Sequence, residues 1–197
     1  AHELELGIDP LRRDPEGFRW RTRSQIEEGR SWLWVEDGVI LFKAEASAWT
    51  PAAVQIQRAL ATASWPQGGA VRVHIGIHTG EPIRTTEGYT GLDVIRGARI
   101  KEAGHGGQVL LSASTAAIVQ DALLDELGLR DLGAHRLKSL PRPERIFQLL
   151  IPGLPVDFPP LQTLDSRAGP QSGAEGERML TTVLITDIVA ATERLVA

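Results

Sequence analysis

The sequence predicts an α+β fold, with an antiparallel sheet and helices packed on one side of it. Residues 71–77 alternate apolar and polar side chains, which is typical of a half-buried strand. Residues 91–104 and 112–123 have helical spacing, and the second segment opens on a serine suited to capping. Residues 129–140 and 144–150 are predicted to close the sheet as a pair of strands.

Composition limits the classes of protein to consider. The chain has 197 residues, 42% hydrophobic and 23% charged, as in ordinary soluble domains. A net charge of −4 gives no reason to expect nucleic acid or an anionic membrane as a partner. The absence of cysteine excludes disulfides and thiolate metal sites and fits a reducing compartment, so we expect a cytoplasmic protein. No apolar run approaches the roughly 20 residues of a membrane span.

The N-terminal segment is predicted to form a helix over residues 9–30 and a hairpin over residues 31–49, with an Asp-Gly turn. Residues 1–57 resemble a fragment of a GNAT-type acetyltransferase. The resemblance ends before the loop that holds the coenzyme A pyrophosphate in that family, and no Gly-x-Gly turn opens a helix here. We therefore favour a helix and hairpin packed on a neighbour, and expect no binding of acetyl-coenzyme A.

The predicted strand at residues 71–80 has two histidines and two glycines on one face. His74 and His78 are four residues apart, about 13 Å along a strand, which is too far to share a metal ion. We expect them to face solvent or to form hydrogen bonds. Gly76 and Gly80 indicate a close approach by another backbone or by a ligand.

Three segments, "VRVHIGIHTGEP", "YTGLDVIRGARIKEAGHGGQVLLSAST" and "LRDLGAHRLKSLPRPERIFQL", resemble the C-terminal half of a class III adenylate/guanylate cyclase catalytic domain. They are most similar to the bacterial branch in which this domain precedes an ATPase module. The resemblance implies a cyclase-like sheet with a ferredoxin-like core. It also implies conversion of ATP or GTP to a cyclic nucleotide and pyrophosphate, with Mg²⁺ or Mn²⁺, in a homodimer.

The last twenty residues contain "LTTVLITDIVAATERL", which resembles the first strand and loop of the same domain. We predict that residues 178–188 form a strand paired inside the sheet of residues 71–150, since an unpaired apolar strand would be an exposed edge. The resemblance implies metal ligation by the Asp187 side chain and the Ile188 carbonyl. It implies nucleotide-phosphate binding by the backbone of Ile188, Val189, Ala190, Ala191 and Thr192. An aspartate that only caps the next helix is the alternative for Asp187.

At other functional positions of the cyclase family, this sequence has the family's residue in some cases and a different residue in others. Arg99 matches an arginine that stabilises phosphate charge in the transition state, with a surface ion pair as the alternative. Ile95 replaces an asparagine that orients the ribose, and Gly88 replaces the purine-selecting carboxylate. The family's second metal-binding aspartate lies in a Gly-Asp-Gly hairpin, for which the sequence has no match. Asp93 and Glu81 are the first candidates to replace it, although a surface carboxylate at a helix start is the simpler interpretation of Asp93.

These features predict four segments. Residues 1–57 form the acetyltransferase-like fragment, 58–151 the C-terminal half of a cyclase-like domain, 152–177 a Pro/Gly-rich linker, and 178–197 the N-terminal strand and helix start of a cyclase-like domain. Tandem domains, circular permutation and a recombined fragment all fit this order. We expect an incomplete or inactive cyclase domain, and the alternative is a non-catalytic cyclase-like module for binding or regulation.

Overall fold

The computed structural model describes residues 34–36, 39–41, 46–64, 70–85, 88–123, 126–162, 177–178 and 180–189. The predicted helix over residues 9–30 lies outside these ranges. The elements in chain order are β1 Trp34–Glu36, β2 Val39–Leu41, α1 Ala46–Thr62, β3 Arg72–Gly80, β4 Ile83–Thr85, β5 Gly88–Thr90, α2 Leu92–Ala103, β6 Val109–Ser112, α3 Ala113–Val119, the 3₁₀ turn η2 Gln120–Ala122, β7 Gly128–His135, β8 Glu144–Leu150, β9 Glu177–Arg178 and β10 Thr181–Val189.

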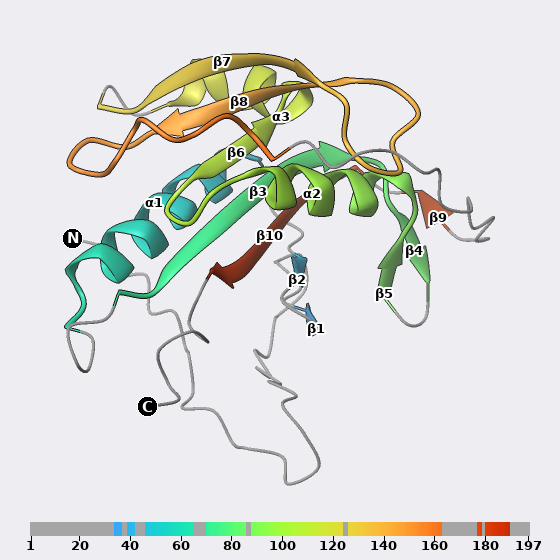
Figure 1. Ribbon diagram of the computed structural model, residues 1–197. Helices are drawn as coiled ribbons and strands as arrows, with labels where there is room; N and C mark the ends of the chain where they lie inside the picture. The colour runs from blue at the N-terminus through green and yellow to red at the C-terminus, as the bar shows by residue number, and fades with distance from the viewer. Residues whose placement is uncertain are drawn as a thin grey trace, which may run out of the picture.

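The main sheet has seven strands in the order β1-β2-β10-β3-β6-β8-β7 (Figure 1). The predicted α+β class is confirmed. The sheet is mixed rather than wholly antiparallel, because β3 and β6 run parallel while the other neighbours are antiparallel. Helix α2 lies between these two strands in the chain, and a crossover of this kind is what parallel strands require.

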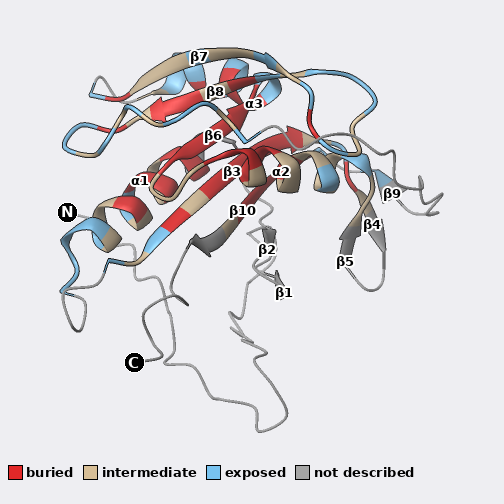
Figure 2. Ribbon diagram, in the orientation of Figure 1, coloured by how far each residue is buried: buried red, intermediate tan, exposed pale blue. Residues whose placement is uncertain are grey.

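Helices cover both faces of the sheet, so the prediction of helices on one side is wrong. One core packs α1 and α3 against Val73, Ile75 and Ile77 of β3. On the opposite face, α2 packs against β6 and β8 through Ile100 and Ala103, and against β10. The face of β3 that carries polar residues and glycine is therefore covered as well, which is why β3 and β6 are buried over most of their length (Figure 2).

Strand β10 confirms the predicted strand for residues 181–188, whereas Arg178 belongs to β9. Strand β10 lies between β2 and β3 and pairs antiparallel with β3 along its whole length, from Thr181↔Gly80 to Val189↔Arg72. Residues 183–185 are fully buried. The last described strand of the chain is thus an interior strand of the sheet, paired within the same chain.

Helix α1 includes the end of the predicted hairpin and the predicted boundary at residue 57. Trp49, Ala53 and Val54 are buried in the same core, a spacing that suits a helix rather than a returning strand. The hairpin predicted up to Trp49 is therefore too long, since α1 begins at Ala46. The Gln57 side chain donates a hydrogen bond of 3.0 Å to the Val73 carbonyl. Helix α1 runs through the predicted boundary and is joined to β3 at the boundary residue itself.

The first part of the predicted linker packs on the domain. Leu154 and Leu161 contact the two cores, and the Gln162 amide donates a hydrogen bond of 2.9 Å to the Ala103 carbonyl. Residues 163–176 lie outside the described ranges. Beyond them, β9 joins β4 and β5 in a small second sheet.

Candidate functional site

Helix α2 lies directly on the two central strands β3 and β10. A Cβ atom added to Gly76 would lie 2.6 Å from the backbone nitrogen of Lys101, and one added to Gly97 would lie 3.2 Å from the Ile185 side chain. The close approach predicted at Gly76 is confirmed, and the approaching backbone is that of α2. The sheet and α2 therefore act as one rigid support for the residues around them.

A partly buried polar cluster joins α2 to the sheet, and we name it the His78–Asp93 hub. It consists of His78, Asp93, Arg96, Ser112 and Glu144. The His78 ring is 3% exposed, and it hydrogen-bonds through Nε2 to Asp93 Oδ1 (3.1 Å) and through Nδ1 to Ser112 Oγ (2.9 Å). Arg96 pairs with Asp93 and donates from Nε to Glu144 Oε1 at 2.7 Å. The hub thereby connects β3, α2, β6 and β8.

The hub lowers the pKa of the Asp93 carboxyl group. The hydrogen bond from His78 is the largest cause that lowers its pKa from 3.8 to about 2, against an opposing contribution from burial. The Glu81 amide donates to the second carboxylate oxygen at 2.8 Å, and Arg96 adds a favourable charge. The interpretation of Asp93 as a surface carboxylate is therefore wrong, because both of its oxygens are hydrogen-bonded inside the fold.

The same contacts argue against Asp93 as the second metal-binding carboxylate, since they already hold it to His78, Glu81 and Arg96. The prediction that the histidines form hydrogen bonds is confirmed for His78. Within the described ranges, no group of three or more His, Asp or Glu residues is placed to hold a metal ion. The i,i+3 spacing of Asp93 and Arg96 was the sequence signal for the hub, but His78 and Glu144 cannot be connected to it by spacing alone.

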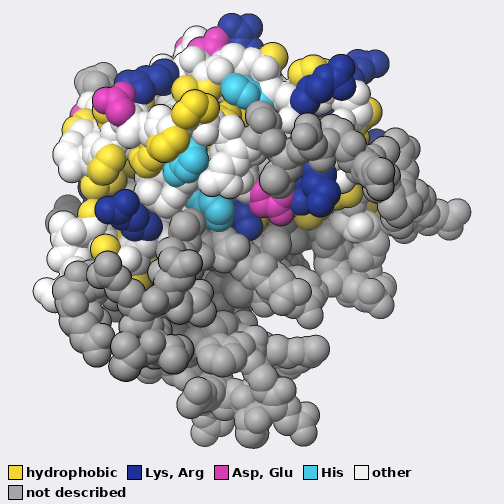
Figure 3. All heavy atoms as spheres, in the orientation of Figure 1, with side chains coloured by type: hydrophobic (Ala, Val, Ile, Leu, Met, Phe, Trp, Pro, Cys, Tyr) yellow, Lys and Arg dark blue, Asp and Glu magenta, His cyan; other side chains and the backbone are white. Residues whose placement is uncertain are grey.

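Arg99 takes part in an ion pair within α2. Its Nη1 donates to Glu102 Oε2 at 2.5 Å, and its Nε is buried and has no hydrogen-bond partner among the described residues. Acidic and basic side chains lie side by side over α2 (Figure 3). Ile95 is 38% exposed on the same helix. This structure therefore places an exposed apolar side chain where the family resemblance implies a polar contact to ribose.

The predicted metal and phosphate residues lie at the end of β10. Asp187 pairs with His74 of β3, and the strand continues through Ile188 to Val189. Ile188 and Val189 are thus the last two residues of the strand. Ala190, Ala191 and Thr192 lie outside the described residues.

A hairpin forms the other neighbour of β10. Strands β1 and β2 pair through Glu36↔Val39, and the residues between them in the sequence are Asp37 and Gly38. Strand β2 pairs with β10 through Ile185↔Val39. The two strands of the hairpin predicted for this segment are thus present. The sequence between them and at the end of β1 is Glu-Asp-Gly, which differs at its first residue from the Gly-Asp-Gly of the family that the chain resembles.

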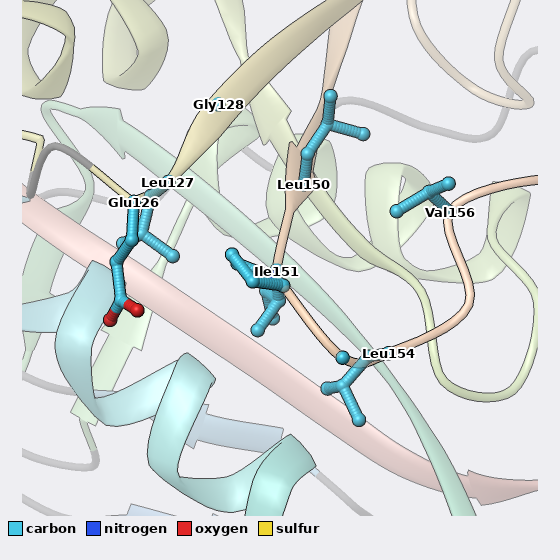
Figure 4. A pocket seen from close by; sticks show the side chains of 9 residues that line it. Glu126, Leu127, Gly128, Leu150, Ile151, Leu154 and Val156 are labelled. Atoms are coloured by element: carbon cyan, nitrogen blue, oxygen red, sulfur yellow. The ribbon is translucent and has the colours of Figure 1, made fainter.

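An apolar pocket of about 340 Å³ lies away from these residues, where β8 ends and β7 begins. Leu127, Ile151 and Leu154 line it, and the Glu126 carboxylate points toward α1, where it pairs with Arg58 at 3.3 Å (Figure 4). None of the residues that line the pocket is lysine or arginine, so the pocket has no positive charge to bind a nucleotide phosphate.

The chain has relatives in mycobacteria, although no family model matches it. The uncharacterized protein Rv0891c of Mycobacterium tuberculosis is 46% identical over 96 residues, which are 49% of this chain and 34% of that protein. The uncharacterized protein Rv1359 of the same organism is 34% identical over 137 residues, covering 65% of this chain and 50% of that protein. The chain thus spans between a third and a half of the length of these relatives.

Among solved structures, the chain is similar to an adenylate/guanylate cyclase/hydrolase from Silicibacter pomeroyi, with a TM-score of 0.48, 26% identity, and coverage of 57% of this chain and 66% of that one. The guanylate cyclase domain of RhGC from Catenaria anguillulae, solved with GTP, gives a TM-score of 0.43, 13% identity, and coverage of 54% and 59%. None of the described helices is both long and apolar enough to cross a membrane. These similarities lend no support to the acetyltransferase resemblance. In fold, the chain is similar to the catalytic domains of class III adenylate and guanylate cyclases.

Proposed function

We propose that the chain forms a divalent-cation and nucleoside-triphosphate site of the class III cyclase type, where β10 lies between β2 and β3. The pairing of β10 is the observation that supports this. Ile185 pairs with Val39, and positions 187 and 37 each lie two residues from that pair in the sequence. Both positions are aspartates. Carboxylates are the oxygen ligands that Mg²⁺ and Mn²⁺ use, so these two aspartates are the ligands we propose.

In this proposal Asp37 and Asp187 hold the cations, together with the backbone carbonyl of Ile188. The backbone that follows, through Thr192, binds the phosphates by N–H groups. Bound Mg²⁺ or Mn²⁺ would neutralise negative charge on the triphosphate. Two copies of the chain would build the site, as the resemblance implies.

We propose further that the site binds ATP or GTP without cyclising it. The Ile95 side chain cannot hydrogen-bond a ribose, and it is exposed on α2, the helix that carries Arg99. The Arg99 guanidinium is engaged with Glu102 and would have to leave that pair to reach a phosphate. Gly88 offers no carboxylate to a purine, so the preference between ATP and GTP is left open. A non-catalytic nucleotide-binding module is therefore the function we favour over an active cyclase.

We expect Asp187→Asn and Asp37→Asn each to weaken binding of Mn²⁺ and of Mn²⁺–ATP or Mn²⁺–GTP by at least about tenfold, because each change removes an anionic ligand. Isothermal titration of the purified chain measures both affinities. Asp157→Asn is the matched control, since Asp157 is 89% exposed and pairs only at the surface with Arg130. Unchanged affinity in both test variants would refute the proposed site.

We expect the chain to form no cyclic nucleotide above background from ATP or GTP with Mn²⁺, because Ile95 cannot orient the ribose. Mass spectrometry of the reaction mixture measures the product directly. Product that appears with the parent chain and disappears with Asp187→Asn would show that the domain is an active cyclase after all.

A further inference from the structure

The two arginines of α2 are held in different ways. Arg96 pairs with two carboxylates of the His78–Asp93 hub, those of Asp93 and Glu144, and is thereby fixed between α2 and β8. Arg99 has one carboxylate partner in the described part of the chain, Glu102, which lies three residues further along the same helix. The bond runs from Nη1 to Oε2 at 2.5 Å. The ion pair of Arg99 therefore ties it to its own helix and to no other element.

The pair with Glu102 leaves the Arg99 guanidinium incompletely bonded. Its Nε is buried and has no acceptor among the residues that the structure describes. A buried N–H group without an acceptor costs more than a partly exposed ion pair contributes, and the two side chains here are 24% and 32% exposed. A phosphate group offers several charged oxygens to the five donors of arginine. Exchange of Glu102 for a phosphate is therefore favoured at Arg99 but not at Arg96.

Helical spacing places Ile95, Arg99 and Glu102 on one face of α2. The opposite side of the helix contacts the sheet, because Ala98 packs against Val183 and Ile185 of β10. Ile95 is 38% exposed, so the face that it shares with Arg99 is open to a ligand.

The same end of α2 lies next to the end of β10. The Gly104 carbonyl, where the helix stops, lies 3.3 Å from Nδ1 of His74. His74 is paired in the sheet with position 187, near which we propose the nucleotide site. Arg99 precedes Gly104 by five residues, which is about 8 Å along a helix. The long arginine side chain is thus carried by the helical turns nearest to that site.

We propose that Glu102 competes with the phosphates of the bound nucleotide for Arg99, and thereby sets the affinity of the site. The inference rests on the proposed function, because it needs ATP or GTP at the end of β10. Glu102 holds Arg99 while no nucleotide is bound and releases it when the triphosphate binds. The energy of the Glu102 pair is lost at that step, so the carboxylate weakens binding without contacting the ligand.

The test is a double-mutant cycle on Mn²⁺–ATP affinity, measured by isothermal titration of the parent chain, Glu102→Gln, Arg99→Gln and the double variant. We expect Glu102→Gln to tighten binding by about fivefold, the factor that corresponds to an ion pair of this exposure. Arg99→Gln should weaken binding by about tenfold, because a charged donor to the phosphates is lost. The double variant should bind as Arg99→Gln does, since Glu102 then has no arginine to hold.

Glu126→Gln is the matched control, because it also removes one negative charge, and Glu126 pairs with Arg58 of α1 rather than with α2. It should leave the affinity unchanged. Equal tightening by Glu126→Gln, or tightening by Glu102→Gln that persists without Arg99, would refute the competition and assign the effect to net charge. No tightening by Glu102→Gln would also refute it, while the proposed function stands. A parent chain that binds neither Mn²⁺–ATP nor Mn²⁺–GTP would overturn both proposals.

Nuclear magnetic resonance of the ¹⁵N-arginine-labelled chain gives a readout that needs no change at Glu102. The Nε–H resonance of Arg99 is assigned by its absence from the Arg99→Gln spectrum. We expect it to shift when Mg²⁺–ATP is added, because the guanidinium turns from Glu102 to phosphate oxygens. Adenosine, which has no phosphate, should leave it in place. A resonance that stays unmoved at saturating Mg²⁺–ATP would overturn the inference.

Discussion

Replacing Gly76 with alanine should lower the free energy of unfolding by about 3 kcal/mol, the upper part of the range for overpacked cores. The new methyl group would lie 2.6 Å from the Lys101 backbone nitrogen and 2.8 Å from its Cα. Both are backbone atoms, so the contact is relieved only by moving α2. The strand cannot bend away, because Gly76 pairs with Ile185 on one side and Leu110 on the other. Urea unfolding followed by circular dichroism measures the loss.

Gly128→Ala is the matched control for this prediction. Gly128 also lies in a strand, but its added Cβ would be no closer than 3.4 Å to any neighbour, an ordinary contact with the Leu150 side chain. We expect the free energy of unfolding to stay within about 1 kcal/mol of that of the parent chain. A small increase would follow from the reduced conformational freedom of the unfolded chain with alanine. Equal effects of the two substitutions would contradict the close packing of α2 on β3.

Periodicity in the sequence was enough to predict the longer elements between residues 71 and 150, although the short strands β4 and β5 were not predicted. The alternation around Ile75 defines β3, and the helical spacing around Arg99 defines α2. Ser112 confirms its predicted role as a helix cap, accepting from the Thr115 amide at 3.3 Å. These features depend on residues close together in the chain, which is where local physical preferences act.

The candidate site could be predicted only in part, because it is made by register between distant segments. Asp187 was identified from its own flanking residues. Its neighbours, His74 on one strand and the hairpin of Val39 on the other, are far from it in sequence. A pairing shift of one residue would turn every side chain to the opposite face, so sequence patterns alone do not determine which residues meet. The same reason explains why the His78–Asp93 hub was missed.

Replacing Asp93 with asparagine should destabilise the fold by about 2 to 3 kcal/mol near neutral pH. The substitution removes the negative charge that pairs with Arg96. It also places the NH₂ group of the asparagine side chain, a donor, against the backbone N–H of Glu81, which is a donor too. Polar groups are then left without hydrogen-bond partners in a half-buried site. Asp121→Asn is the control, since Asp121 is exposed in the 3₁₀ turn after α3. Urea unfolding at pH 7 should show a large loss for the first variant and none beyond error for the second.

The pH dependence of unfolding provides a separate test of the hub. Folding lowers the pKa of Asp93 from 3.8 to about 2, so the ionised carboxylate stabilises the folded state above pH 4. That contribution, about 2 kcal/mol in all, is lost as the pH falls from 4 toward 2, and roughly half of it should be gone at pH 3. Asp93→Asn lacks the titrating group, so its unfolding free energy should fall less between pH 5 and pH 3 than that of the parent chain. Parallel pH profiles for the two proteins would mean that Asp93 is not held by His78 in the way the structure describes.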